Sequence, residues 1–144
     1  ANDASKEIVN TARFSLSAIY VHLEQFDKGE QILEDVLKVE PDNIQANNDL
    51  GYLWADRRKN LEQAKGMIQK ALAAEPENAA YLDSMGWVQY RLGQFAEAKP
   101  HLLKAIEKPR GEDATIWDHL GDVQDKLGEK EDAIKSWVKA LEME

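Results

Sequence analysis

The chain has 144 residues, the length of one ordinary domain, and its 43% hydrophobic and 31% charged residues indicate a folded protein rather than a disordered one. Its net charge of −9 argues against nucleic acid as the main partner, because binding a polyphosphate depends on clustered Lys and Arg. The absence of cysteine excludes disulfides and thiolate metal sites, and the absence of an apolar run of about 18 residues predicts no membrane span in this segment.

The first residues, Ala1-Asn2-Asp3, contain neither Met nor an apolar signal core. We expect either a mature protein or a fragment of a longer one, and the sequence leaves open a leader that has been removed. Residues 1–9 are predicted to extend the first helix backwards or to form a short lead-in to it.

A large apolar residue followed by a small one recurs four times, with steps of 34, 35 and 35 between the small residues; the pairs are Leu16-Ser17, Leu50-Gly51, Met85-Gly86 and Leu120-Gly121. A second series recurs at nearly the same period, with steps of 35, 34 and 35, and each of its members precedes a Val or Ala by three residues; its members are Leu33, Ile68, Leu102 and Trp137. Self-similarity at this period is typical of a stack of identical supersecondary units.

In chain order the four units are predicted to occupy residues 10–43, 44–78, 79–113 and 114–144. Within each unit, apolar residues recur twice at offsets of three and four, which places each set on one helix face and predicts a helical hairpin. In the second unit a polar turn over residues 56–60 separates the two helices, and Asn60 is expected to cap the second one. Pro41 and Pro76 end the first two units, because proline cannot continue a helix.

Spacing locates the residues that lengthen two of the steps. From the small residue to the Val or Ala of the second helix the spacing is 19, 20, 19 and 19, which places one insertion at Arg57–Asn60. From that Val or Ala to the small residue of the next unit, the spacing is 15, 15 and 16, which places the other insertion at Lys108–Asp113. Pro100 lies about two turns into a predicted helix, where we expect a kink with the ring on the convex side.

The small residues need a packing reason, because glycine inside a helix costs roughly 1 kcal/mol relative to alanine. We predict that Gly51, Gly86 and Gly121 allow the second helix of each unit to approach the first closely. Their expected small partners on the second helices are Ala64, Ala98 and Ala133, with Gly29 at the equivalent place in the first unit.

These residues resemble the pattern of the tetratricopeptide repeat family, which has Leu-Gly in the first helix, two alanines in the second and a proline at the end. The fourth unit matches it at Trp117, Leu120-Gly121, Ala133, Trp137 and Ala140. Arg13 and Asn47 depart from it, because they stand where the pattern has a large residue. The resemblance implies an all-α fold, a right-handed superhelical solenoid of four antiparallel helix pairs that forms a single domain over residues 1–144.

The resemblance also implies a concave groove that is lined by the first helix of each unit. The residues at the matching positions form an aromatic middle flanked by carboxylates, and the candidate binding residues are Asn48, Tyr52, Asp83, Trp87, Tyr90, Arg91, Asp118 and Asp122. Such a groove favours a protein or peptide partner with apolar and basic side chains. In the alternative interpretation, Trp87 and Tyr90 only fill space between adjacent first helices.

The carboxylate clamp of the family, made of Lys, Asn and Arg, holds the C-terminal carboxylate of a chaperone. At the matching places in units two to four this chain has Asn48, Tyr52, Ser84, Thr115 and His119, and only Asn48 is of the required kind. An acidic groove should repel a carboxylate, so this type of co-chaperone function is disfavoured.

No catalytic residue, metal site or cofactor is predicted. His22, His101 and His119 fall in different units without the spacing of metal ligands. Asp118, His119 and Asp122 resemble an acid–base set, but a solvated helix face is the favoured interpretation. By register the tryptophans are expected in the core, with Trp87 as the exception.

The leading hypothesis is therefore a non-catalytic scaffold that binds a peptide segment of a partner in its concave groove. The alternative is a structural module that self-associates through its terminal repeats, since no polar capping helix follows the last predicted helix. The stretch Leu50–Val88 also resembles bacterial multi-repeat proteins of this family, several of which are envelope or lipoprotein adaptors. That resemblance slightly favours a bacterial periplasm or envelope over the cytoplasm.

Overall fold

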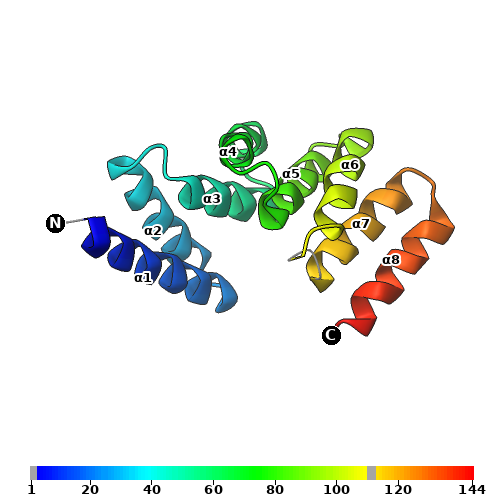
Figure 1. Cartoon of the computed structure of the whole chain (residues 1–144), viewed down its shortest axis with the longest axis horizontal. Helices are drawn as coiled ribbons and strands as arrows, with labels where there is room; N and C mark the ends of the chain where they lie inside the picture. Colours follow the sequence, from blue (N-terminus) through cyan, green and yellow to red (C-terminus); the bar gives the residue numbers. More distant parts are fainter. Residues whose placement is uncertain (1–2, 110–112) are drawn as a thin grey trace.

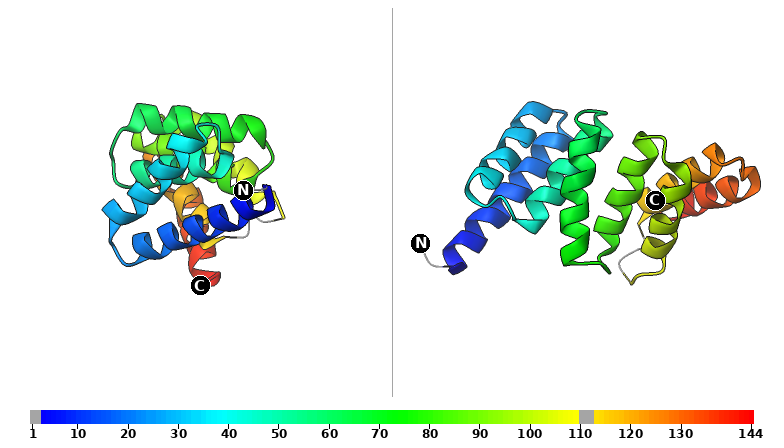
Figure 2. Two further views of the ribbon diagram at one scale, coloured as in Figure 1. Left: turned by 90° about the vertical axis from the view of Figure 1, so that its left-hand side faces the viewer. Right: turned by 90° about the horizontal axis from the view of Figure 1, so that it is seen from above.

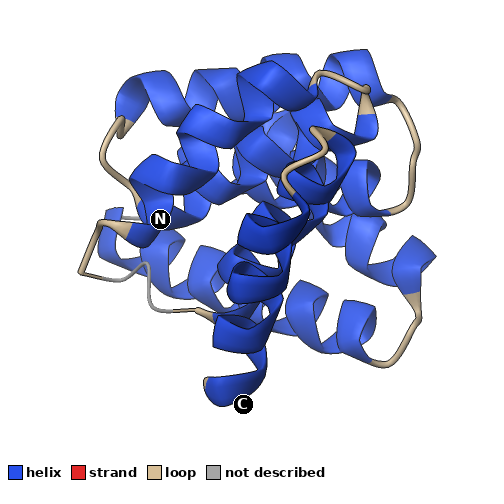
Figure 3. Ribbon diagram, turned by 90° about the vertical axis from the view of Figure 1, so that its right-hand side faces the viewer, coloured by secondary structure: helices blue, strands red, loops and turns tan. Residues whose placement is uncertain are grey.

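The chain is described by a computed structural model over residues 3–109 and 113–144, and within these residues it forms eight α-helices and no strand (Figures 1 and 3). The all-α prediction is confirmed, and the first helix includes most of the predicted N-terminal extension. The helices are α1 (Asp3–His22), α2 (Phe26–Val39), α3 (Ile44–Asp56), α4 (Leu61–Ala74), α5 (Ala79–Arg91), α6 (Phe95–Ile106), α7 (Ala114–Lys126) and α8 (Lys130–Glu142).

Successive helices pair into four hairpins that stack along the long axis of the molecule, with the two termini at opposite ends (Figures 1 and 2). Within the stack, each second helix also packs against the first helix of the next hairpin: α2 against α3, α4 against α5, and α6 against α7. The first helix of the third hairpin, α5, contacts both α3 and α7. This arrangement is the predicted solenoid of helix pairs.

The core runs continuously through the stack. Equivalent positions of the second helices, Leu33, Ile68 and Leu102, and of the first helices, Leu50, Met85 and Leu120, are at most 3% exposed. Burial of one such side chain contributes about 1.5–3 kcal/mol relative to leaving it in water. The buried side chains form two apolar clusters, one around Leu50 and Ile68 and the other around Leu102 and Leu120. Leu72 and Tyr90 pack against both clusters, so each hairpin depends on its neighbours for burial.

The repeated glycines lie where the two helices of a hairpin meet. A Cβ atom on Gly51 would lie 2.7 Å from Cγ1 of Ile68, and one on Gly86 would lie 2.5 Å from Cγ of Leu102. A Cβ atom on Gly121 would collide with the indole of Trp137. Close approach is therefore the reason for these glycines. The nearest side chain in each case is the large residue of the second helix, and for Gly51 the backbone oxygen of the predicted partner Ala64 also lies 3.0 Å from the added Cβ atom.

The first hairpin reaches the same close approach with its small residues exchanged between the helices. Ser17 occupies the glycine position of α1, and Gly29 faces it from α2. The Ser17 hydroxyl donates a 2.8 Å hydrogen bond to the Gly29 carbonyl oxygen. A Cβ atom on Gly29 would lie 2.8 Å from Cγ2 of Val21, so the predicted role of Gly29 agrees with the contacts.

The turns inside the hairpins confirm one predicted insertion and correct one predicted cap. Three of the turns have three residues, whereas the turn of the second hairpin has four, residues 57–60. Asn60 precedes α4 but adopts a left-handed conformation with φ of 48°, and its side chain makes no capping hydrogen bond. The capping prediction for Asn60 is therefore wrong, because the inserted residue places a second left-handed position, besides Arg58, in this turn.

Side-chain caps occur instead before the first helices. The carboxamide oxygen of Asn43 accepts from the Ala46 amide at 2.9 Å, that of Asn78 from the Ala80 amide at 2.9 Å, and the Asp113 carboxylate from the Thr115 amide at 2.8 Å. These caps fix the N-termini of three of the helices that line the concave face.

Pro100 lies within α6 with its ring exposed, and the helix continues through it to Ile106. The second predicted insertion, Lys108–Asp113, falls largely on residues 110–112, which lie outside the described residues. Over the described residues, none of the helices combines the length and the hydropathy needed to cross a membrane.

Candidate functional site

The first helices of the four hairpins enclose a groove with a volume of about 480 Å³. Its lining combines apolar side chains from α1 with polar and acidic side chains from α3, α5 and the start of α7. The side chains that matter for the following argument are Phe14, Ala18, Val21, Asn48, Asp49, Tyr52, Asp56, Ala80, Asp83, Ser84, Asp113 and Thr115.

Of the eight predicted binding residues, Asn48, Tyr52 and Asp83 line this groove. The other five, which do not line it, are Trp87, Tyr90, Arg91, Asp118 and Asp122. The prediction therefore includes the middle of the groove, but it extends further along α5 and α7 than the groove does.

Trp87 belongs to the core, contrary to the prediction that it is the one tryptophan outside it. The indole is only 6% exposed and stacks on the imidazole of His119, with ring centroids 3.9 Å apart and an interplanar angle of 13°. The Tyr90 ring stacks on the Trp87 indole with centroids 5.0 Å apart. The guanidinium carbon of Arg91 lies 4.3 Å from the centroid of the Trp87 ring. The space-filling alternative is the correct interpretation for Trp87.

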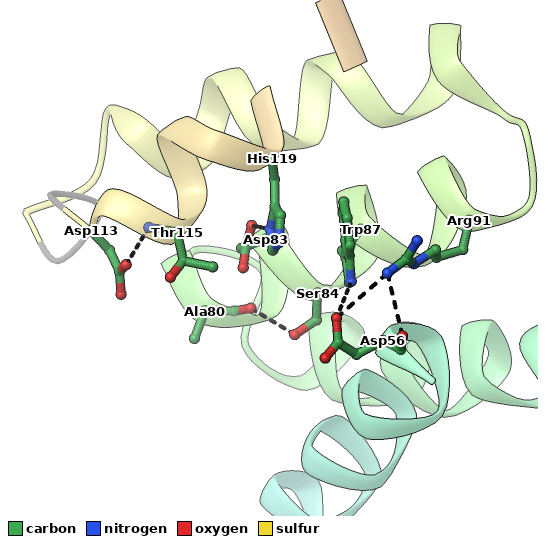
Figure 4. Close-up of polar contacts among 9 residues, drawn as sticks. All are labelled: Asp56, Ala80, Asp83, Ser84, Trp87, Arg91, Asp113, Thr115 and His119. Atoms are coloured by element: carbon green, nitrogen blue, oxygen red, sulfur yellow. Dashed lines mark hydrogen bonds and ion pairs between the residues drawn. The ribbon is translucent and has the colours of Figure 1, made fainter. Parts of the chain in front are cut away.

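His119 is buried as well, so the expectation of a solvated helix face is wrong for this residue. Its Nδ1 lies 2.8 Å from Oδ1 of Asp83, and both residues are at most 7% exposed (Figure 4). The pair links α7 to α5 at the edge of the groove. Asp118, the neighbour of His119 in sequence, is exposed.

Asp56 joins the second hairpin to the third at the other edge. Its carboxylate accepts a hydrogen bond from the Trp87 indole N–H at 3.3 Å and lies 3.7 Å from Nη2 of Arg91 (Figure 4). The same guanidinium nitrogen donates to the Asp56 carbonyl oxygen at 3.3 Å. Arg91 thus serves to hold two hairpins together.

Asp122 and Tyr90 are part of the packing around the last two hairpins. The indole N–H of Trp137 donates to Asp122 at 3.2 Å, and the Tyr90 ring lies 5.5 Å from that of Phe95. Burial, and then the nearby charge of Asp118, raise the pKa of the Asp122 carboxyl above its usual range. Burial likewise raises the pKa of the Tyr90 phenol.

The groove itself is acidic. Four aspartates line it, and no Lys, Arg or His is among the described residues that do so. Burial raises the pKa of Asp49, against hydrogen bonds from Asn48 and Gln45, which lower it. Burial also raises the pKa of the Tyr52 phenol, and the charges of Asp83 and Asp56 add to this effect.

Asn48 adds an unsatisfied polar group to the wall of the groove. Its side-chain nitrogen donates to Asp49 at 3.1 Å, but its buried Oδ1 has no hydrogen-bond partner among the described residues. A buried acceptor without a donor costs about 1–3 kcal/mol. A ligand that brings an N–H group to this wall would remove that cost.

The sequence-based groove positions missed Asp49 and Ser84, which also line the groove. Each follows a predicted groove residue directly and precedes an aromatic residue by three positions, at Tyr52 and Trp87. For Asp49, the i, i+3 spacing from Tyr52, which lines the groove, was the available signal; for Ser84 it gave none, because Trp87 lies in the core. Over the described residues, no group of three or more His, Cys, Asp or Glu side chains could hold a metal ion.

The stacked hairpins and their concave groove define a helical-repeat solenoid protein. The family model for the tetratricopeptide repeat matches residues 18–79 and 84–142, and the chain belongs to this family. Proteins built from such repeats are interaction scaffolds, and this general role is what the family supports for the chain. No protein with a curated description matches the sequence.

Among solved structures, the fold is similar to that of proteins named MamA. The structure titled "MamA MSR-1 C2" is 24% identical with a TM-score of 0.66, over 91% of this chain and 74% of that one. A MamA fragment from Desulfovibrio magneticus RS-1 is 18% identical with a TM-score of 0.71, over 91% of this chain and 73% of that one. At these identities the likeness concerns the fold alone.

Proposed function

We propose that the chain is a non-catalytic scaffold whose groove binds a peptide segment of a protein partner through apolar and basic side chains. The observation that carries the proposal is the lining of the groove, which places four aspartates and no basic side chain among its described residues. A cationic side chain is the ligand group that such a surface favours.

The acidic part of the groove supports a Lys or Arg on the ligand. Asp83 already contacts His119, and Asp56 contacts Trp87 and Arg91. Among the described residues, Asp49, in contrast, is hydrogen-bonded only to uncharged amides, at 3.1 Å from Asn48 and 3.5 Å from Gln45. The pKa of Asp49 is raised by burial, so a cation beside it would offset an unfavourable charge.

The apolar part of the groove lies on the side of α1. Phe14, Ala18 and Val21 line it there, and Tyr52 faces the same space from α3. An apolar side chain of the ligand fits this side, whereas a basic side chain fits the side of Asp49. The ligand is therefore expected to present an apolar and a basic residue close together in sequence.

Selection from a phage-displayed library of random peptides tests the proposal, because it samples many ligand sequences at once. We expect selected peptides to be enriched in Lys or Arg next to apolar residues, and to bind the chain in fluorescence anisotropy. Ala80→Arg adds a large cation to an exposed residue that lines the groove, and should weaken the affinity at least about tenfold, or 1.4 kcal/mol.

Ala96→Arg is the matched control, because Ala96 is an exposed residue of α6 that does not line the groove. It should bind the selected peptides as the unchanged chain does. Failure to select any peptide, or equal affinities for the two arginine variants, would contradict the proposal.

A further inference from the structure

We propose that copies of this chain bind one another head to tail, with the outer face of α8 on one copy packed against the outer face of α1 on the next. The proposal concerns the two ends of the stack and is independent of the groove. It rests on the contacts that the three internal junctions repeat between one hairpin and the next.

The outer face of α1 has the side chains of an internal junction but lacks its cover. Leu16 and Ile19 occupy the repeat positions of Leu50 and Leu53, Met85 and Val88, and Leu120 and Val123. Those six side chains are at most 5% exposed, because the second helix of the preceding hairpin packs against each of these first helices. Leu16 and Ile19 are 44% and 54% exposed.

Exposed apolar residues of α1 and of the turn directly after it form one continuous stripe. Val9, Leu16 and Leu23 are spaced by seven residues, with Leu23 just past the end of the helix, and Ile19 lies between the last two. Offsets of three, four and seven place all four on a single helix face. A face of this kind is what α3, α5 and α7 present to the helices that cover them.

The outer face of α8 is the complementary half of the same junction. Leu141 occupies the repeat position of Leu37, Leu72 and Ile106, which pack against the apolar clusters of the stack. Leu141 is 69% exposed, whereas its three equivalents are only partly exposed. No helix of the described chain packs on this side of α8 (Figure 1).

The composition of α8 strengthens this argument. Ile134 occupies the repeat position of Glu30, Lys65 and Lys99, each of which bonds a side chain of the next hairpin: Lys59, Gln94 and Glu129 respectively. At the end of the stack this bridging position is instead apolar and 57% exposed. Ile134, Val138 and Leu141 therefore form an apolar stripe, where the internal helices combine apolar and charged residues.

A second copy is the occupant that fits both faces at once. Within the described residues, no second helix covers positions such as Leu16 at one end of the stack, and no helix covers the outer face of α8 at the other. Contact between the α8 face of one copy and the α1 face of the next would repeat an interface that already occurs three times within the chain. Since the two surfaces differ, the contact is heterologous, and it continues into open chains rather than closing as a dimer.

Sedimentation velocity over a concentration series of the 144-residue chain tests this directly. The weight-average mass should rise with concentration from 16.3 kDa to more than twice that value. A chain that stays at 16.3 kDa at the highest concentration overturns the proposal. Such a result would indicate that another segment or another protein covers these faces.

Two charge-bearing variants separate head-to-tail packing from other modes. Leu16→Glu with Ile19→Glu disables the α1 face, and Ile134→Glu with Leu141→Glu disables the α8 face. Each variant alone should be monomeric, and an equal mixture should form one species of two chains and nothing larger. Oligomers of either variant alone would mean that like faces pair, and would overturn the proposal.

A control variant adds the same two negative charges at exposed positions away from the α1 and α8 faces. Val39→Glu with Leu103→Glu changes two exposed apolar residues of α2 and α6 and should leave self-association unchanged. Loss of association in this variant would attribute the effect to net charge and contradict the proposal. Circular dichroism of all variants should show unchanged helix content, because the substituted residues are exposed. Peptide binding by the monomeric variants reports on the groove separately.

Discussion

The imidazole of His119 and the carboxylate of Asp83 form a buried hydrogen bond of 2.8 Å between the fourth hairpin and the third. The ring of His119 also lies on the indole of Trp87, so one side chain makes both a polar and a stacking contact across the same junction. Because Asp83 lines the groove, this junction also fixes one wall of the proposed binding surface.

Asp83→Ala should lower the free energy of unfolding by about 1–3 kcal/mol, because it leaves a buried imidazole nitrogen without its partner. Urea denaturation followed by circular dichroism measures the change. Asp118→Ala alters an exposed carboxylate next to His119 in sequence, and should change the free energy by less than about 0.5 kcal/mol. Equal effects of the two substitutions would show that the buried pair contributes nothing specific.

Two helical glycines should respond to alanine with opposite signs. Gly86→Ala places a Cβ atom 2.5 Å from Leu102 and should destabilise the chain by about 1–3 kcal/mol, the usual cost of overpacking. Gly66, in α4, has open space around the same atom, so Gly66→Ala should stabilise by about 0.5–1 kcal/mol. Thermal unfolding of both variants measures the difference, and a Gly86→Ala variant that is as stable as the unchanged chain, or more stable, would refute the packing role of Gly86.

The solenoid could be predicted from the sequence because its signals recur. The register of the four units is given by their small residues, Ser17, Gly51, Gly86 and Gly121. The pattern of each unit independently predicts the same pair of helices. The groove was predicted less completely, because its shape depends on single residues at equivalent positions. Repeat position alone cannot say whether a neighbouring side chain covers a residue.

Tyr52 and Trp87 illustrate this limit, since they occupy the same repeat position but differ in exposure. The imidazole of His119 covers Trp87. At the position equivalent to His119 in the preceding hairpin stands Ser84, which is small, and both Ser84 and Tyr52 line the groove. The identity of a residue in the next unit therefore decides which aromatic is available to a ligand.

The residue type alone also could not predict which asparagine caps a helix with its side chain. Asn60 and Asn78 both precede a helix, but only the Asn78 side chain accepts hydrogen bonds from the helix that follows. Asn78→Ala should therefore cost about 1 kcal/mol of stability. Asn60→Gly should instead be neutral or stabilising, because glycine adopts φ of 48° without strain. Chemical denaturation compares them, and a loss of stability in Asn60→Gly equal to that in Asn78→Ala would contradict this assignment.

Asp49 offers a test in which stability and binding change in opposite directions. Burial raises its pKa in the folded chain, so folding disfavours the ionised carboxyl. The contribution of this group to stability is therefore lowest at pH values above the folded pKa, and stability is gained as the pH falls through that pKa. Asp49→Asn should therefore raise the urea midpoint at pH 7, by an amount that shrinks as the pH falls toward about 4.

The same substitution removes the carboxylate that is proposed to face a cation, so it should weaken binding of a Lys- or Arg-containing peptide in anisotropy. Asp35→Asn is the control, because this exposed carboxylate of α2 lies outside the groove and should leave both the midpoint and the affinity nearly unchanged. A stabilised Asp49→Asn variant that keeps full affinity would separate the two effects and remove Asp49 from the proposed site. A destabilised variant at pH 7 would instead contradict the unfavourable burial of its charge.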